Sequence, residues 1–225
     1  MTSLIDLSQI TRSFPPTTRA LRNVTFSISP SQSVVITGPS GSGKSTLLGI
    51  LGLLDSPDSG TYTLEGTHVE SLTQRQKTEV RKTSIGYIFQ AFNLIDYLSV
   101  RENILHSLDI KGLHGATAAA RADTTLAQVG LTHRADAYPP TLSGGEQQRT
   151  AIARALSADP KVLLCDEPTG NLDSTNSRTV LDLLLAALTP ENTVIIVTHD
   201  PAIAAACDRQ IVIEDGSVTH DSERS

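Results

Sequence analysis

Gly38-Pro39-Ser40-Gly41-Ser42-Gly43-Lys44-Ser45-Thr46 is the most informative motif in the 225-residue sequence. It fits the pattern G-x-x-x-x-G-K-[ST] and lies between an apolar run, residues 33–37, and a helical pattern that starts at Lys44. Glycines at positions 38, 41 and 43 let the backbone curl so that its N–H groups point inward, and a helix start adds partial positive charge. The stretch predicts a strand, loop and helix that cradle phosphate groups.

The last side chains of this stretch suit the phosphates of a nucleotide. Lys44 supplies a full charge to the β- and γ-phosphates, the Ser45 hydroxyl can bind Mg²⁺, and Thr46 offers a further N–H and hydroxyl near the α-phosphate. A glycine-rich turn that happens to contain a lysine is the alternative, and the strand before it and helix after it argue against that. We predict that all nine residues bind nucleotide. The motif does not specify which reaction the bound nucleotide undergoes.

Strands alternate with helices around this stretch, which predicts an α/β fold with a mostly parallel sheet. Buried strands are expected at residues 33–37, 162–166, 193–198 and 210–213, and helices at 44–53, 146–157 and 174–188. Residues 4–11, 21–29 and 61–64 alternate in polarity, which indicates a small antiparallel sheet beside the main one. Residues 91–148 show no buried strand and are interpreted as a helical insertion, with the core at 1–90 and 149–225. Beyond the polar last few residues no low-complexity tail is expected.

Two adjacent carboxylates, Asp166 and Glu167, end the apolar run that starts at Val162. A buried parallel strand delivers its last residues to the carboxyl edge of the sheet, where ligands bind in α/β folds. Asp166 is therefore a candidate for holding Mg²⁺, and Glu167 for orienting and deprotonating an attacking water. A solvated strand end is the alternative, which the phosphate cradle makes weaker.

The stretch Leu142-Ser143-Gly144-Gly145-Glu146-Gln147-Gln148-Arg149 resembles the signature motif of ABC ATPases. Ser143 and Glu146 have the spacing of a capping box, and a buried stripe is expected at Ala151, Ile152, Ala155 and Leu156. Two glycines leave the first N–H groups of this helix open to an anion. The resemblance implies a head-to-tail dimer in which the residues Ser143, Gly144, Gly145 and Glu146 of one chain cover the ATP that Lys44 of the other holds. An ordinary capped helix is the alternative.

The resemblance covers essentially the whole chain and implies roles for four further residues. Phe14 fits the aromatic residue that stacks on adenine, although a core aromatic is the alternative. Gln90 resembles the catalytic glutamine that senses Mg²⁺ and the attacking water, and Asp173 belongs to a loop that contacts the opposite subunit. His199 resembles the switch histidine on the γ-phosphate. The fold that the family implies is a P-loop NTPase with a RecA-like sheet and an inserted α-helical subdomain, and its cofactors are ATP and Mg²⁺.

Three stretches, residues 52–60, 88–94 and 166–173, are similar to a narrower branch of the family. That branch includes macrolide exporters, lipoprotein-release motors, haem exporters, antimicrobial-peptide exporters and a cell-division pair. It implies an ATPase that powers export or extraction of a lipophilic or amphipathic substrate through a separate integral membrane permease. A regulatory, force-transmitting ATPase of the cell-division type is the alternative, and a soluble DNA or ribosomal ABC ATPase or a P-loop kinase fits less well.

The apolar residues after Gln90 are candidates for docking a helix of the permease. They are Phe92, Leu94, Ile95, Tyr97 and Leu98. The alternative is that they form the core of the helical insertion.

Composition bounds the remaining possibilities. A formal net charge of −6 repels nucleic acid, and the basic stretch around Arg75 and Lys82 is interpreted as a solvated helix face. Cys165 and Cys207 lie in apolar surroundings, so buried reduced thiols are expected. The start has no basic leader and no apolar run approaches membrane-spanning length. We therefore expect a cytoplasmic protein, peripheral on the inner face of the cell membrane.

Overall fold

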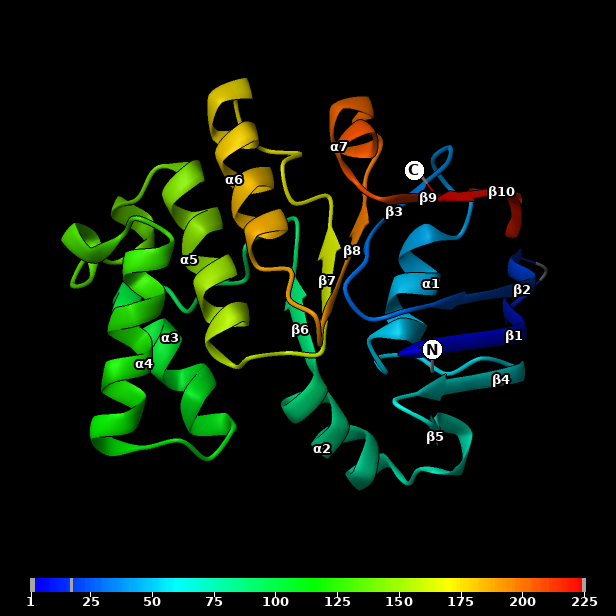
Figure 1. Cartoon of the computed structure of the whole chain (residues 1–225), viewed down its shortest axis with the longest axis horizontal. Coiled ribbons are helices and arrows are strands. Elements are labelled where there is room, and N and C mark those ends of the chain that lie inside the picture. Colours follow the sequence, from blue (N-terminus) through cyan, green and yellow to red (C-terminus); the bar gives the residue numbers. More distant parts are fainter. Residues whose placement is uncertain (1–2, 17, 224–225) are drawn as a thin grey trace. The chain divides into compact units, whose positions relative to one another are not determined.

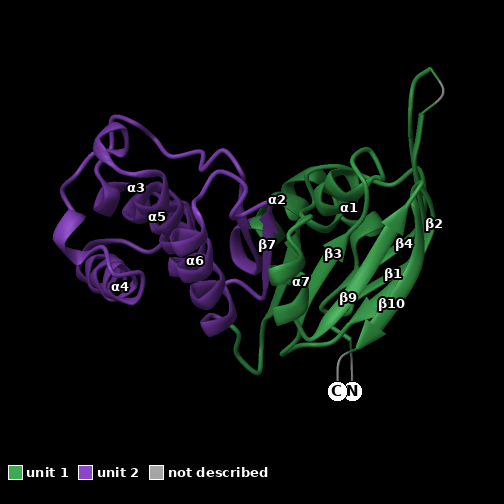
Figure 2. Ribbon diagram, turned by 90° about the horizontal axis from the view of Figure 1, so that it is seen from above, with its two compact units in different colours: residues 1–81, 188–225 green, residues 82–187 purple. Residues whose placement is uncertain are grey.

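The computed structural model describes residues 3–16 and 18–223 (Figure 1). Its chain divides into two compact units, which Figure 2 colours green and purple. The first unit holds the described residues up to Arg81 and from Leu188 onward, and the second holds Lys82–Ala187.

An antiparallel sheet in the order β2-β1-β4-β5 forms one part of the first unit. Its strands are β1 (Ile5–Phe14), β2 (Thr18–Ile28), β4 (Ser59–Leu64) and β5 (Thr67–His68). In the second half of β2, Val24, Phe26 and Ile28 are buried while their neighbours are exposed, because successive side chains point to opposite faces. The small antiparallel sheet predicted from alternating polarity is confirmed.

Parallel pairing in the same unit is centred on β3. The strands are β3 (Ser33–Thr37), β8 (Thr193–Val197), β9 (Arg209–Glu214) and β10 (Ser217–Glu223). β3 pairs in parallel with both β8 and β9, and β10 returns antiparallel along β9. Val34, Val35 and Ile36 have no exposed surface, as expected of a strand covered on both faces.

Three helices complete the first unit. They are α1 (Lys44–Leu51), α2 (Gln74–Ser84), whose last residues belong to the second unit, and α7 (Pro201–Ala206). A short 3₁₀ turn covers Val69–Ser71. Helix α1 begins at Lys44, as predicted, and buries four apolar side chains, whereas α2 buries none. Of the basic stretch, Arg75 is exposed, whereas Arg81 is partly buried and donates to the Leu53 carbonyl oxygen, so this helix face is only partly solvated.

The second unit pairs two parallel strands and carries four helices. They are β6 (Ile85–Ile88), α3 (Val100–Ile110), α4 (Gly115–Gln128), α5 (Gly144–Ser157), β7 (Val162–Asp166) and α6 (Ser174–Ala186). Short 3₁₀ turns cover Thr132–Arg134 and Pro139–Thr141. Helices α3, α4 and α5 pack against one another (Figure 1). Residues 91–148, all of them described, contain helices and no strand, as the predicted helical insertion requires.

Some boundaries differ from those expected from the sequence. The compact second unit also contains β6, β7 and α6, so it is larger than residues 91–148, and the sequence-based domain division stays a prediction. Ser217–Glu223, for which no strand was expected, form β10. Asp215 and Gly216 have φ of 47° and 81°, which is the backbone of a two-residue hairpin turn. Ala151, Ile152 and Ala155 are buried as expected, whereas Leu156 is partly exposed.

Both cysteines are buried and neither forms a disulfide, as predicted. Within the described part of the chain, none of the helices combines the length and hydropathy needed to cross a bilayer.

Candidate functional site

The glycine-rich loop between β3 and α1 curls as its sequence predicts. Gly38, Gly41 and Gly43 have φ of 147°, 78° and 103°, values that favour glycine. A Cβ atom on Gly38 would lie 2.0 Å from the Ile213 carbonyl oxygen, and one on Gly43 would lie 2.2 Å from the Ala20 carbonyl oxygen. Neighbouring backbone therefore excludes any side chain at both positions, and the loop is held in the curled form.

Lys44 lies across the mouth of this loop. Its Nζ donates to the carbonyl oxygens of Gly38 and Pro39, both at 2.8 Å. Helix α1 has Gly43 as its N-cap and no side-chain capping bond, so its first N–H groups keep no side-chain acceptor. The Ser42 Oγ is buried and has no hydrogen-bond partner. A cation, uncapped helix amides and an orphaned hydroxyl together fit a phosphate group.

His199 lies at the same sheet edge as the loop. β3 and β8 are parallel with Ile36 opposite Val197, so the residues that follow both strands emerge at one edge. His199 is exposed there, two residues after β8 ends, and Asp200 caps α7 by accepting from Ala202 N at 2.8 Å. The structure therefore brings His199 and the glycine loop to one edge of the first unit.

Phe14 ends β1 with 39% of its surface exposed. The guanidinium carbon of Arg12 lies 4.8 Å from the centre of its ring, and Arg12 also pairs with Asp55 and Asp58 at 2.8 Å. The exposure argues against the alternative of a core aromatic. An exposed ring next to a cation can stack on a flat heterocycle.

In the second unit, the parallel pair β6 and β7 brings Gln90 and Asp166 to one edge. Ile88 lies opposite Cys165, so Gln90 and Asp166 follow at the ends of neighbouring strands. Tyr87 on β6 stacks on Phe89 with ring centres 4.1 Å apart. Burial, and then the charge of Asp166, raise the pKa of the Tyr87 phenol. The Tyr87 phenol therefore stays neutral beside the carboxylate.

Glu167 and Gln90 both lie close to Gly170. The Glu167 φ of 45° lies in the left-handed region, which is uncommon for a residue with a side chain. A Cβ atom on Gly170 would lie 3.3 Å from Gln90 Nε2 and 3.6 Å from Glu167 Cβ. Asn171 Nδ2 donates to the Gln90 carbonyl oxygen at 3.1 Å. The predicted base and the predicted glutamine thus lie close to the same glycine.

The start of α5 forms the capping box that its sequence predicts. Ser143 N and Oγ donate to Glu146 Oε2 at 2.8 and 2.9 Å, and Ser143 Oγ accepts from Glu146 N at 3.3 Å. Arg134 Nε lies 3.1 Å from Glu146 Oε1. The hydrogen bond from the Ser143 backbone is the main cause of a lowered Glu146 pKa.

Asn176 connects this helix start to Asp173. A Cβ atom on Gly145 would lie 2.2 Å from Asn176 Oδ1, so a side chain at this position would require the Asn176 amide to move. Asn176 donates from its backbone N and from Nδ2 to the two Asp173 oxygens at 3.0 and 2.7 Å, and the backbone bond is the main cause of a lowered Asp173 pKa. A Cβ atom on Gly144 would lie 3.6 Å from Leu172 Cδ2, which is an ordinary van der Waals contact. The structure therefore joins Ser143–Glu146 to the loop that contains Asp173.

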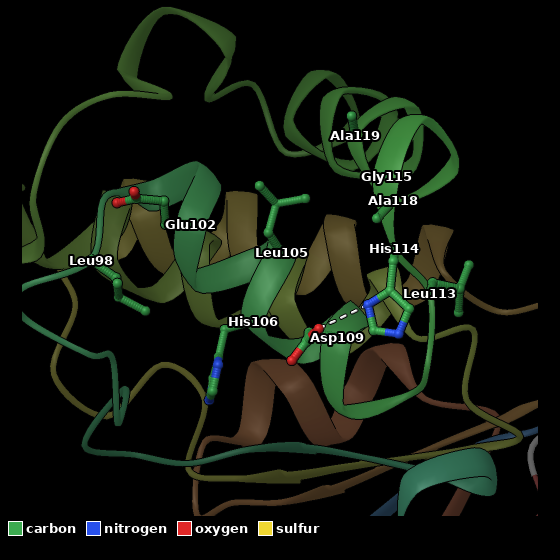
Figure 3. Close-up of a pocket in the computed structure, with 10 residues that line it drawn as sticks. All are labelled: Leu98, Glu102, Leu105, His106, Asp109, Leu113, His114, Gly115, Ala118 and Ala119. Atoms are coloured by element: carbon green, nitrogen blue, oxygen red, sulfur yellow. Dashed lines mark ion pairs between the residues drawn. The ribbon is translucent and has the colours of Figure 1, made fainter.

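The segment after Gln90 is not a buried core. Tyr97 is 80% exposed, and Phe92, Leu94, Ile95 and Leu98 are only partly buried. Leu98 lines a cavity of about 430 Å³ between α3 and α4, shown in Figure 3. The other lining residues are Glu102, Leu105, His106, Asp109, Leu113, His114, Gly115, Ala118 and Ala119.

Sequence reasoning missed three side chains that hold these loops: Asn103, Arg154 and Asn176. Asn103 is fully buried and pairs with the backbone N and O of Ile95. A polar residue between the apolar Val100 and Ile104, within the predicted helical insertion, is the signal that could have identified Asn103. For Arg154 and Asn176 the sequence gives no comparable signal.

Comparisons with known proteins match this geometry. The profile of the family described as "ABC transporter" matches residues 21–170. The chain is 43% identical, over 99% of its length, to the "Macrolide export ATP-binding/permease protein MacB" of Chlorobium luteolum, of which it spans 34%. It is 42% identical, over 96% of each chain, to the "Lipoprotein-releasing system ATP-binding protein LolD 1" of Rhodopirellula baltica.

A solved structure agrees in fold. It is the dimeric structure of a post-hydrolysis state of the ATP-binding cassette MJ0796, bound to ADP and Pi. It is 36% identical with a TM-score of 0.89, over 98% of this chain and 99% of that one.

The fold and the glycine loop define a P-loop nucleotide-binding protein. The family match and the full-length relative place it further: the chain belongs to the ABC transporter family. The predicted branch of macrolide exporters and lipoprotein-release motors is confirmed by the same relatives. The chain spans about a third of the macrolide-export relatives, in whose names an ATP-binding and a permease function are combined.

Proposed function

We propose that the chain is the ATP-binding and ATP-hydrolysing subunit of an exporter, acting through a separate integral membrane permease. The observation that carries the proposal is that one chain holds two glycine-led helix starts, at α1 and at α5. One ATP gripped by the first leaves the second without a partner in the same chain. Relatives named for macrolide export and lipoprotein release support a lipophilic or amphipathic substrate, and a position on the inner face of the cell membrane.

ATP is assigned to residues 38–46, with its adenine on Phe14. The loop amides and Lys44 would hold the β- and γ-phosphates, for which the orphaned Ser42 hydroxyl and uncapped α1 leave suitable donors. Ser45, Asp166 and Gln90 supply the hard oxygen donors that Mg²⁺ prefers. When bound, Mg²⁺ would neutralise charge on the phosphates during transfer.

Glu167 is assigned as the base that takes a proton from the attacking water. Its backbone is left-handed, and a Cβ atom on Gly170 would lie close to both Glu167 Cβ and Gln90 Nε2. His199, at the edge shared with the loop, is assigned to the γ-phosphate as the switch residue. General base catalysis of this kind contributes about 10²- to 10⁴-fold to a rate.

A second copy of the chain is assigned as the partner that completes each site. In a head-to-tail pair, Ser143, Gly144 and Gly145 of one copy would cover the phosphate held by Lys44 of the other. Twofold symmetry makes the two contacts reciprocal. The dimeric cassette with 36% identity supports this arrangement, and Asp173, tied to Gly145 through Asn176, would lie at the same interface.

The permease is assigned to the partly exposed apolar segment Phe92–Leu98 and to the adjoining cavity between α3 and α4 (Figure 3). The apolar face of a permease helix can pack in such a groove. Glu102 and Asp109, at the rim of the groove, can pair with basic residues of that helix.

The deciding experiment uses Glu167→Gln with ATP and Mg²⁺. We expect this variant to bind ATP, to form dimers on a sizing column, and to hydrolyse ATP roughly 10²- to 10⁴-fold more slowly than the parent. Glu214→Gln, a change at an exposed glutamate on β9, is the matched control and should behave as the parent. If Glu167→Gln hydrolysed ATP at the rate of the parent, Glu167 would not be the general base. Monomers alone under these conditions would remove the proposed function.

A further inference from the structure

The Gln90–Leu98 segment joins β6 to α3 and is held by side chains from three other places in the second unit. Asn171, after β7, donates to the Gln90 carbonyl oxygen. Arg154, on α5, donates from Nη2 to the Phe92 carbonyl oxygen at 3.1 Å and from Nη1 to the Asn93 carbonyl oxygen. Asn103, on α3, holds Ile95. Of these three, Arg154 alone stands on the helix that begins with Ser143.

The backbone that Arg154 holds adopts an unfavourable conformation. Phe92 and Asn93 have φ of 57° and 52°, both left-handed. A left-handed residue with a side chain is disfavoured by about 1–2 kcal/mol, although asparagine tolerates this region better than phenylalanine. The turn therefore needs tertiary contacts to persist, and the two bonds from Arg154 are contacts of that kind.

Arg154 is partly buried. Burial lowers its pKa, and both acceptors are neutral carbonyl oxygens. Burying a charge against neutral groups is costly, so packing alone would favour an apolar side chain on this helix. The planar guanidinium group of Arg154 donates to two successive carbonyl groups at once in a fixed geometry, which the ammonium group of a lysine cannot do.

We propose that Arg154 is a positioning residue that couples the Gln90–Leu98 segment to the phosphate-covering start of α5. The proposal rests on the proposed function, because it assigns the permease to this segment and a phosphate to Ser143–Gly145. Gly144 and Arg154 belong to one continuous helix and lie about 15 Å apart along its axis. A displacement of the segment therefore moves the helix start, and engagement of the helix start orders the segment.

Reciprocity makes the coupling measurable without the permease, because two coupled sites affect each other equally. In Glu167→Gln protein, hydrogen exchange at residues 92–98 is followed with and without ATP and Mg²⁺. With Arg154 present, we expect ATP-driven dimerisation to slow exchange there by roughly tenfold. Combining Glu167→Gln with Arg154→Met should leave the dimer in place and remove this slowing. Arg154→Lys, which can reach one carbonyl group at a time, should retain only part of it.

Arg178→Met is the matched control, because Arg178 lies exposed on α6 and pairs with Asp182 on the same helix. It should keep the full slowing. If the dimer of Arg154→Met shows the full slowing, Arg154 has no coupling role. Full slowing in Arg154→Lys would overturn the assignment of the coupling to the two bonds of the guanidinium. Should Arg154→Met fail to fold, Arg154→Lys decides alone. If the Glu167→Gln parent stays monomeric, the proposed function fails and this inference with it, whereas a dimer with unchanged exchange overturns only the inference.

Discussion

The ammonium group of Lys44 donates to the carbonyl oxygen of Gly38 at 2.8 Å, which joins the last part of the glycine-rich loop to its first residue. The same group also donates to the Pro39 carbonyl oxygen. These bonds hold a positive charge against the backbone of the glycine-rich loop. Preorganised donors of this kind lose little on binding, because their orientation is already fixed.

Lys44→Met should weaken ATP binding by roughly 10- to 100-fold, since a hydrogen bond to a charged group contributes about 1.5–3 kcal/mol. Titration with a fluorescent ATP analogue measures the change. Lys77→Met is the control, because the Lys77 side chain on α2 donates to Ser56 Oγ, away from the glycine-rich loop. Parental affinity in Lys44→Met would show that the loop amides suffice and that the lysine is not a phosphate ligand.

Gly43→Ala should destabilise the protein far more than Gly66→Ala, although both glycines have left-handed backbones. A Cβ atom at Gly43 would meet the Ala20 carbonyl oxygen, whereas one at Gly66 would meet nothing within 4 Å. We expect losses of about 2–5 kcal/mol for Gly43→Ala and about 1–2 kcal/mol for Gly66→Ala in urea unfolding without nucleotide. Equal losses would mean that the loop can shift away from Ala20.

The Ser143 capping bonds should give α5 a pH-dependent stability. The folded-state pKa of Glu146 is lowered, mainly by the hydrogen bond from the Ser143 backbone. A lowered pKa contributes stability that is present above the unfolded value and is lost as the pH falls through the folded value. Glu146→Gln should therefore reduce the urea midpoint at pH 7, and the difference from the parent should shrink as the pH is lowered below that of an ordinary carboxyl group.

Ser143→Ala provides a second measure of the same cap. Loss of a serine N-cap lowers the free energy of unfolding by about 1 kcal/mol, and urea unfolding at pH 7 measures it. Ser177→Ala, on α6 and outside the cap, is the control. If the urea midpoints of Glu146→Gln and the parent differ by the same amount at every pH, the Glu146 carboxylate is not the group whose titration changes the stability.

The sequence predicted those parts of the fold that depend on local pattern and backbone chemistry. The apolar run before Gly38 is β3, the run that ends at Asp166 is β7, and the spacing of Ser143 and Glu146 is a capping box. Each follows from neighbouring residues, so no knowledge of the tertiary structure was needed.

The contacts that hold loops together could not be predicted in this way. Arg154 reaches carbonyl groups 61 and 62 residues earlier in the chain, and a carbonyl acceptor carries no sequence signal. β10 was missed because its polar residues do not alternate in burial, although the Asp215-Gly216 turn before it is a hairpin signal.

Replacing Phe92 and Tyr97 with alanine should weaken the complex with the permease more than it changes ATP hydrolysis by the isolated chain. Tyr97 is 80% exposed and Phe92 is partly buried, so neither side chain is needed for a closed core. Exposed aromatic residues carry a large share of the binding energy at interfaces, and we expect a roughly tenfold or greater loss of affinity. Two quantities are measured for each variant. One is its co-purification with the permease, and the other is its ATPase activity in the absence of the permease. Tyr138→Ala, at a tyrosine that is 49% exposed elsewhere in the second unit, should leave both unchanged. If ATPase activity fell while the complex stayed intact, the segment would act on the nucleotide site and would not be the docking surface.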